Sequence, residues 1–127
     1  MSQSKVLLVD DEEELVSTLT DRLRWRNLDA DAATSGYAAL ELLQQQNYDI
    51  VVIDLMMPGL DGLDLRRIIR RDYPGVEVLL ITGHGADLEG QEFDEDIVGD
   101  VLLKPFDINE LVARIREKLG NDGRAGV

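Results

Sequence analysis

Short apolar runs alternate along the chain with longer segments in which apolar residues recur every three or four positions. A short continuous apolar run is typical of a strand buried on both faces, whereas the longer spacing places apolar side chains on one face of a helix. The pattern therefore predicts strands and helices in alternation. The predicted strands are 5–9, 28–33, 49–53, 76–81 and 101–103, and the predicted helices are 12–26, 35–46, 62–71 and 107–119.

This alternation is typical of an α/β domain in which helices cover both faces of a parallel sheet, a (βα)5 arrangement with right-handed crossovers. Segment 28–33 differs, because Asp29 and Asp31 alternate with apolar residues, which favours an edge strand protected by charge. We predict one domain over residues 1–120, with 121–127 as a flexible tail or the start of a linker.

Composition narrows the classes of protein further. The chain has 127 residues, of which 44% are apolar and 31% charged, as is ordinary for a soluble globular domain. It has no cysteine, its first residues lack the layout of a signal peptide, and no apolar run approaches the roughly 20 residues that span a bilayer. We therefore expect a cytoplasmic protein without a membrane partner. The net charge of −13 argues against direct nucleic-acid binding, which depends on Lys and Arg neutralising phosphates.

Several of the basic residues form two groups along the predicted helices. We interpret both groups as solvent-exposed helix faces, and we expect Trp25 to pack at the end of the first helix. The groups are Arg22, Arg24 and Arg26, and Arg66, Arg67, Arg70 and Arg71.

Four of the predicted strands end in polar residues of complementary chemistry. Asp10 and Asp11 follow the first strand, and Asp54 follows the third. Thr82 follows the fourth strand, and Lys104 follows the fifth. Because ligands of open α/β sheets bind beyond the carboxyl ends of the strands, we expect these side chains to meet at one edge. Any one of them is explained by a polar turn, whereas the combination predicts a site.

The residue types at this edge are those that phosphoryl transfer requires. Clustered carboxylates raise one another's pKa unless a cation is present, and Mg²⁺ with oxygen ligands fits that need. The Lys104 ammonium is suited to pairing with a phosphoryl group, and the Thr82 hydroxyl can donate to one of its oxygens. A carboxylate held among these groups can attack phosphorus and form an aspartyl phosphate.

Four motifs in this order resemble those of the receiver domains of two-component response regulators, the CheY-like family. The resemblance extends from about Ser4 to Leu119, and four motifs at family-like spacing are far more specific than any one of them. The motifs are Val6-Leu7-Leu8-Val9-Asp10-Asp11-Glu12, Asp54-Leu55-Met56-Met57-Pro58-Gly59-Leu60-Asp61-Gly62, Ile81-Thr82-Gly83-His84 and Leu103-Lys104-Pro105-Phe106.

The resemblance implies a flavodoxin-like fold with strand order 2-1-3-4-5. It implies that Asp54 accepts a phosphoryl group from a sensor histidine kinase or a phosphotransfer protein, and that the chain is a signalling switch that loses the group again rather than an enzyme. Asp11 would bind Mg²⁺ directly, together with Asp54 and the main-chain carbonyl of Met56, while Asp10 would act mostly through water. A weak or phosphorylation-dependent dimer is compatible with the resemblance.

The resemblance also implies roles for residues at the fourth and fifth strands. Thr82 and Lys104 would contact the phosphoryl oxygens, and Lys104–Pro105 would be a cis peptide bond. The residue three before Lys104 is usually aromatic in the family, whereas it is Val101 here. Thr82 and Val101 are the expected switch positions, and the absence of a ring at Val101 leaves the output and its partner open.

The segment expected to form the family's fourth helix, 86–98, is acidic and interrupted by Gly90. We predict that it is short, irregular or mobile, and that phosphorylation reorders it through Thr82 rather than through an aromatic rotamer. His84, the only histidine, is interpreted as a loop residue. Gly59 and Gly62 are assigned to turn geometry.

Three alternative functions remain to be weighed. A Mg²⁺-dependent aspartyl-phosphate phosphohydrolase would carry a second Asp two residues after the nucleophile as acid and base, and Met56 stands there instead. A nucleotide- or flavin-binding protein is disfavoured, because no GxGxxG motif or P-loop follows the first strand. A degenerate receiver that serves only as a docking module is disfavoured because Asp10, Asp11, Asp54, Thr82 and Lys104 are all present.

Overall fold

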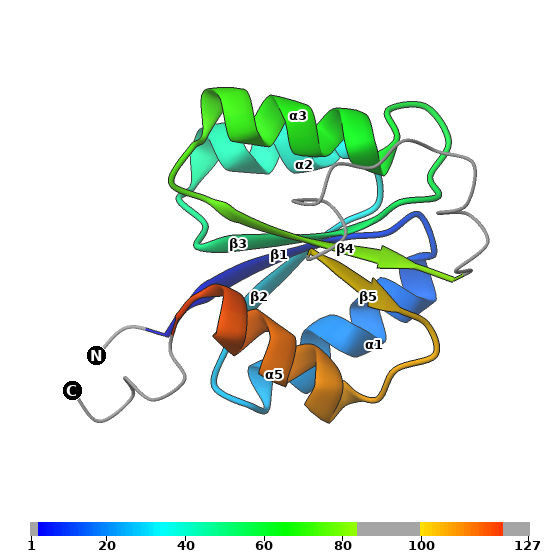
Figure 1. The fold of residues 1–127 in the computed structure, drawn as a ribbon, viewed down its shortest axis with the longest axis vertical. Helices are drawn as coiled ribbons and strands as arrows, with labels where there is room; N and C mark the ends of the chain where they lie inside the picture. Colours follow the sequence, from blue (N-terminus) through cyan, green and yellow to red (C-terminus); the bar gives the residue numbers. More distant parts are fainter. Residues whose placement is uncertain (1–2, 84–99, 121–127) are drawn as a thin grey trace.

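The computed structural model describes residues 3–83 and 100–120. Within these residues, five parallel strands form one sheet in the order β2-β1-β3-β4-β5, flanked by four helices on its two faces (Figure 1). The flavodoxin-like α/β fold and its strand order are thus confirmed. The strands are β1 (Lys5–Val9), β2 (Asp29–Ala33), β3 (Ile50–Asp54), β4 (Glu77–Thr82) and β5 (Val101–Leu103), and the helices are α1 (Glu13–Arg24), α2 (Gly36–Gln45), α3 (Gly62–Asp72) and α5 (Ile108–Lys118).

The alternation of side chains along the strands divides the core into two layers. Val6 and Leu8 of β1 belong to the layer under α1 and α5, whereas Leu7 and Val9 belong to the layer under α2 and α3. Successive side chains of a strand point to opposite faces, so a strand covered by helices on both sides is apolar throughout. This explains why β3 (Ile50–Asp54) is buried at every position.

Helices α2, α3 and α5 begin at residues whose side chains cap them, whereas α1 has no side-chain cap. The side chains of Ser35, Asp61 and Asp107 accept hydrogen bonds from backbone amides in the first turns of α2, α3 and α5, at 2.9–3.0 Å. Such caps satisfy amide groups that have no partner within the helix. Among the described residues, no helix is both long enough and apolar enough to cross a membrane. The predicted fourth helix, 86–98, and the predicted tail lie outside the described residues.

Candidate functional site

Three carboxylates meet at the carboxyl edge of the sheet. Asp54 is the last residue of β3, and Asp10 follows the neighbouring β1, whose Val9 pairs with Ile53. Ligand atoms of Asp10, Asp11 and Asp54 all lie within 4.8 Å of one another. The strand order accounts for this, because β1 and β3 are adjacent although 40 residues of chain separate them. Asp10 and Asp54 are each only 6% exposed, whereas Asp11 faces solvent.

Backbone amides orient the two buried carboxylates. The Glu12 amide donates to Asp10 Oδ1 at 2.9 Å, and the Met56 amide donates to Asp54 Oδ1 at 3.0 Å. Each hydrogen bond joins the carboxylate to the amide two residues later, so the backbone that follows the strand fixes the orientation of the carboxylate. Both Oδ2 atoms are left to face the Lys104 ammonium, whose Nζ lies 3.7 Å from each.

The electrostatics of this edge are dominated by an excess of negative charge. The pKa of Asp10 is raised to about 6, chiefly by burial and also by the nearby Asp54 carboxylate, while the Glu12 amide and Lys104 oppose the rise. With three carboxylates and one ammonium, the cluster carries a net charge of −2 when fully ionised (−3 + 1). Such a group of oxygen donors fits a hard divalent cation.

Two neighbouring strands complete the edge. Thr82 ends β4 and is fully buried, and its carbonyl accepts a hydrogen bond from the Lys104 amide at 2.8 Å. Lys104 follows β5 and precedes a cis peptide bond to Pro105, as the family resemblance implies. All five predicted site residues therefore lie at one edge of one sheet.

The loop after Asp54 contains a feature that sequence reasoning assigned to the wrong cause. Gly59 has a positive φ of 76°, which agrees with turn geometry. Gly62 does not have a positive φ, so turn geometry does not explain it. A Cβ on Gly62 would lie 2.8 Å from the Asp54 carbonyl oxygen and from the Leu55 Cα. The missing side chain at Gly62 therefore allows α3 to begin in contact with the backbone of Asp54 and Leu55. In the same loop Met57 is buried, whereas Met56 is 59% exposed beside the site.

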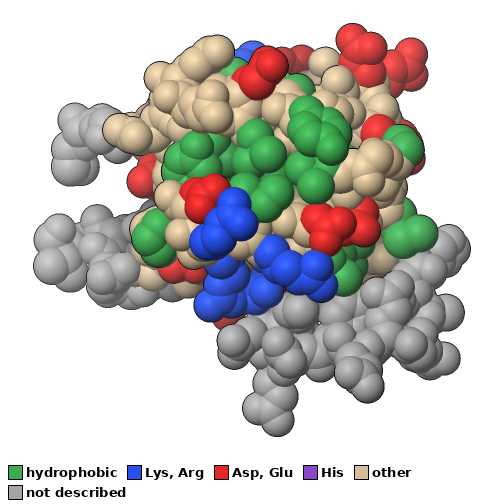
Figure 2. All heavy atoms as spheres, turned by 90° about the horizontal axis from the view of Figure 1, so that it is seen from above, with side chains coloured by type: hydrophobic (Ala, Val, Ile, Leu, Met, Phe, Trp, Pro, Cys, Tyr) green, Lys and Arg blue, Asp and Glu red, His purple; other side chains and the backbone are tan. Residues whose placement is uncertain are grey.

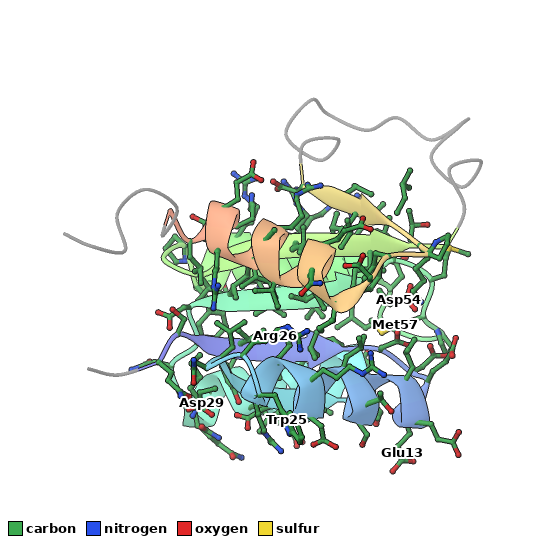
Figure 3. All side chains as sticks on the ribbon, turned by 90° about the horizontal axis from the view of Figure 1, so that it is seen from below. Glu13, Trp25, Arg26, Asp29, Asp54 and Met57 are labelled. Carbon is green, nitrogen blue, oxygen red and sulfur yellow. The ribbon has the colours of Figure 1, made fainter. Side chains whose placement is uncertain are left out.

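Figure 3 shows Asp54 and Met57 at the end of the domain opposite to Asp29. It also shows Trp25 on the outer side of α1, and here the expectation was wrong, because Trp25 is 88% exposed. A second expectation fails at α3, where Arg66 is buried although its neighbours Arg67 and Arg70 are exposed. His84 lies outside the described residues.

Comparison with known proteins agrees with this geometry. The family model described as response regulator receiver domain matches residues 6–116. The chain belongs to this family. The curated heme response regulator HssR of Staphylococcus aureus is 36% identical over 113 residues, which cover 89% of the chain and 50% of that protein. The receiver domain thus spans about half the length of the curated relatives it matches.

Solved structures show the same fold. The receiver domain of the Francisella response regulator 1452 is 31% identical, with a TM-score of 0.79 over 94% of this chain and 99% of that one. The Thermotoga maritima response regulator TrrA, solved in complex with Mg²⁺ and BeF, is 26% identical, with a TM-score of 0.79 over 91% and 98% of the two chains. The chain is thus a response regulator receiver domain, as in two-component systems.

Proposed function

We propose that this receiver domain accepts a phosphoryl group on Asp54 in a reaction that depends on Mg²⁺. The observation that carries the proposal is the pair of equal distances, 3.7 Å, from the Lys104 Nζ to the Oδ2 atoms of Asp10 and Asp54. A nucleophilic carboxylate, an acidic neighbour and a cation thus meet at one place. Catalysis by such a set consists mainly of positioning and charge neutralisation.

Each residue of the site has a part in the transfer. An Asp54 carboxylate oxygen forms a bond to phosphorus while the bond from phosphorus to the donor breaks, and the leaving atom keeps the electron pair. The Lys104 ammonium pairs with the charge on the equatorial oxygens, and the Thr82 hydroxyl contacts one of them. Burial of Asp54 keeps competing water away from the carboxylate.

The donor set fits Mg²⁺. The carboxylates of Asp10, Asp11 and Asp54 and the main-chain carbonyl of Met56 would hold the ion, with Asp10 acting mostly through water. When bound, Mg²⁺ offsets the negative charge of the carboxylates and of the incoming phosphoryl group. The Mg²⁺–BeF complex of the relative TrrA supports this proposal.

The geometry also favours a protein as the donor. A groove of about 360 Å³ adjoins Lys104 and has mostly apolar walls. This groove offers an apolar surface beside the site, and we propose that a sensor histidine kinase or a phosphotransfer protein contacts it when it delivers the phosphoryl group. The groove is lined by Leu15, Leu19, Gly83, Lys104, Pro105 and Phe106.

The remaining expectations are part of the same proposal. Residues 1–120 act as one phosphoacceptor domain in the cytoplasm, without direct contact to nucleic acid. Thr82 and Val101 pass the change at Asp54 to an output partner. A phosphohydrolase is disfavoured, since Met56 offers no acid or base beside the site.

Incubation with acetyl phosphate and Mg²⁺, followed by intact-mass measurement, tests the proposal. We expect a mass increase of one phosphoryl group that is lost after mild alkaline treatment and does not form in excess chelator. A degenerate docking module would show no label under any condition. Repeated turnover of a simple phosphomonoester would instead indicate a phosphohydrolase.

A further inference from the structure

Asp100, at the start of β5, is a junction between the two helical layers. Its carboxylate accepts a hydrogen bond from the Lys118 ammonium of α5 through Oδ1, and the Arg66 guanidinium of α3 lies 3.5 Å from Oδ2. The three side chains are only 16%, 21% and 8% exposed. Figure 1 shows α3 and α5 on opposite faces of the sheet, so Asp100 binds cations from both faces.

Arg66 is a poor contributor to stability in this position. Its Nε has no hydrogen-bond partner within residues 3–83 and 100–120, and its contact to Asp100 is long. A buried ion pair with unsatisfied donors seldom stabilises a fold more than apolar side chains of similar volume would. The other arginines of α3 differ, since they lie on the exposed basic band of the α2–α3 face (Figure 2). Stability alone therefore does not explain the buried Arg66.

The strand that Asp100 precedes carries Lys104 at its other end. β5 has only three residues, and in the described sheet it pairs with β4 alone. The Asp100 carbonyl accepts from the Leu80 amide at 2.7 Å, and the Lys104 amide donates to Thr82 at 2.8 Å. A strand this short has little backbone pairing of its own. Only three residues lie between Asp100 and Lys104, so we expect a shift at Asp100 to move Lys104 as well.

We propose that Asp100 is a positioning residue that acts through Lys104. Held by Arg66 and Lys118, it clamps the start of β5 between α3 and α5 and so fixes where the Lys104 ammonium lies relative to Asp54. The role in phosphorylation rests on the proposed function above. The metal ligands come from β1, β3 and the loops that follow them, so the clamp does not reach them.

The test separates the ammonium from the metal site. In Asp100→Asn we expect the affinity for beryllofluoride and the rate of phosphorylation from acetyl phosphate to fall by roughly three- to tenfold. Mg²⁺ affinity, measured by NMR titration, should stay within about twofold, because no metal ligand is tethered by Asp100. Asp100→Glu should restore most of the loss. Equal losses in Mg²⁺ and beryllofluoride affinity would show general loosening and overturn the proposal.

A variant with both charges removed guards against a folding defect. Asp100→Asn leaves the buried Arg66 without its counter-charge, whereas Arg66→Met with Asp100→Asn removes both. We expect the double variant to unfold near the wild-type temperature. Its affinity for beryllofluoride should remain as low as that of Asp100→Asn. Wild-type binding by the double variant would overturn the proposal. Asp72→Asn, which breaks the exposed pair with Arg71, is the matched control and should change neither affinity.

A double-mutant cycle shows whether the effect passes through Lys104. Adding Asp100→Asn to Lys104→Ala should slow phosphorylation no further, because the positioned group is gone. Additive losses would contradict the proposal. Amide exchange decides the clamp even if Asp54 is never phosphorylated. The Lys104 amide hydrogen should exchange faster in Asp100→Asn than in the wild type. The Asp10 amide, which donates a hydrogen bond to the Ala33 carbonyl, should exchange at an unchanged rate. Unchanged exchange at Lys104 would contradict the proposal that Asp100 holds β5 in place.

Discussion

The two edges of the sheet carry similar residues in different electrostatic states. Toward the amino edge, Asp49 accepts a hydrogen bond from the Lys5 amide at 2.7 Å, and Asp31 accepts one from the Tyr48 hydroxyl at 2.7 Å. Lys5 also lies within 4.0 Å of Asp29 and Asp31. At the carboxyl edge Asp10 and Asp54 share the Lys104 ammonium, which lies 3.7 Å from one oxygen of each, and the exposed Asp11 carboxylate lies beside them.

The charged groups toward the amino edge thus stabilise the fold, whereas we infer that the excess charge at the carboxyl edge serves to bind a ligand. The carboxylates toward the amino edge accept hydrogen bonds from the protein and pair with Lys5, so they are satisfied without a ligand. The carboxyl edge keeps an excess negative charge, which the burial of Asp10 and Asp54 makes unfavourable in the protein alone. A divalent cation, as proposed above, would offset that charge and allow a phosphoryl group to approach.

Asp54→Asn should abolish phosphorylation from acetyl phosphate, because the amide cannot act as the nucleophile. Asp49→Asn, which removes a carboxylate at the opposite edge, should leave the rate within about twofold of wild type. Intact-mass spectrometry under matched Mg²⁺ concentrations measures both. Label that persists in Asp54→Asn would mean that another residue is the acceptor.

Asp10→Asn should stabilise the protein in the absence of metal. The folded pKa of Asp10 is about 6 against 3.8 for the free side chain, so ionisation disfavours the folded state. The penalty is absent below about pH 4, grows as the pH rises through this window and is complete above pH 6. Chemical unfolding at pH 7 should show a gain of up to about 3 kcal/mol, which disappears near pH 4. A loss of stability at pH 7 would contradict the electrostatic account.

Mg²⁺ should raise the unfolding temperature of the wild-type protein at neutral pH. A ligand at a hundredfold excess over its dissociation constant stabilises by about 2.7 kcal/mol. The gain should be smaller in Asp10→Asn and should shrink as the pH falls through 6, because protons compete with the metal for this carboxylate. Thermal unfolding with and without Mg²⁺ provides the measurement. An equal gain in Asp11→Asn would place the ion elsewhere.

Tyr48→Phe should have the smallest effect, a loss of about 1 kcal/mol in stability, since it removes one hydrogen bond to Asp31. Burial and this bond raise the pKa of Tyr48, which therefore stays protonated at neutral pH. Because the bond belongs to the amino edge, phosphorylation and Mg²⁺ affinity should not change. A phosphorylation defect here would show that the two edges are coupled.

The sequence by itself determined the order of the elements, the strand boundaries to within a residue or two and the identity of the residues at the carboxyl edge. These are local properties: apolar runs indicate buried strands, Ser35, Asp61 and Asp107 are good helix caps, and polar residues at strand ends meet in any parallel sheet.

Which side chains are buried could not be read from the sequence pattern and depends on the tertiary structure. Arg66 shares a sequence pattern with its exposed neighbours, and Trp25 looks like a core residue, yet their burial is reversed. The reason is that burial depends on residues far away in the chain: Arg66 lies against Asp100, which is 34 residues later and immediately precedes β5. Distances such as those between Lys104 and the two aspartates likewise arise only when β1, β3 and β5 are placed in one sheet.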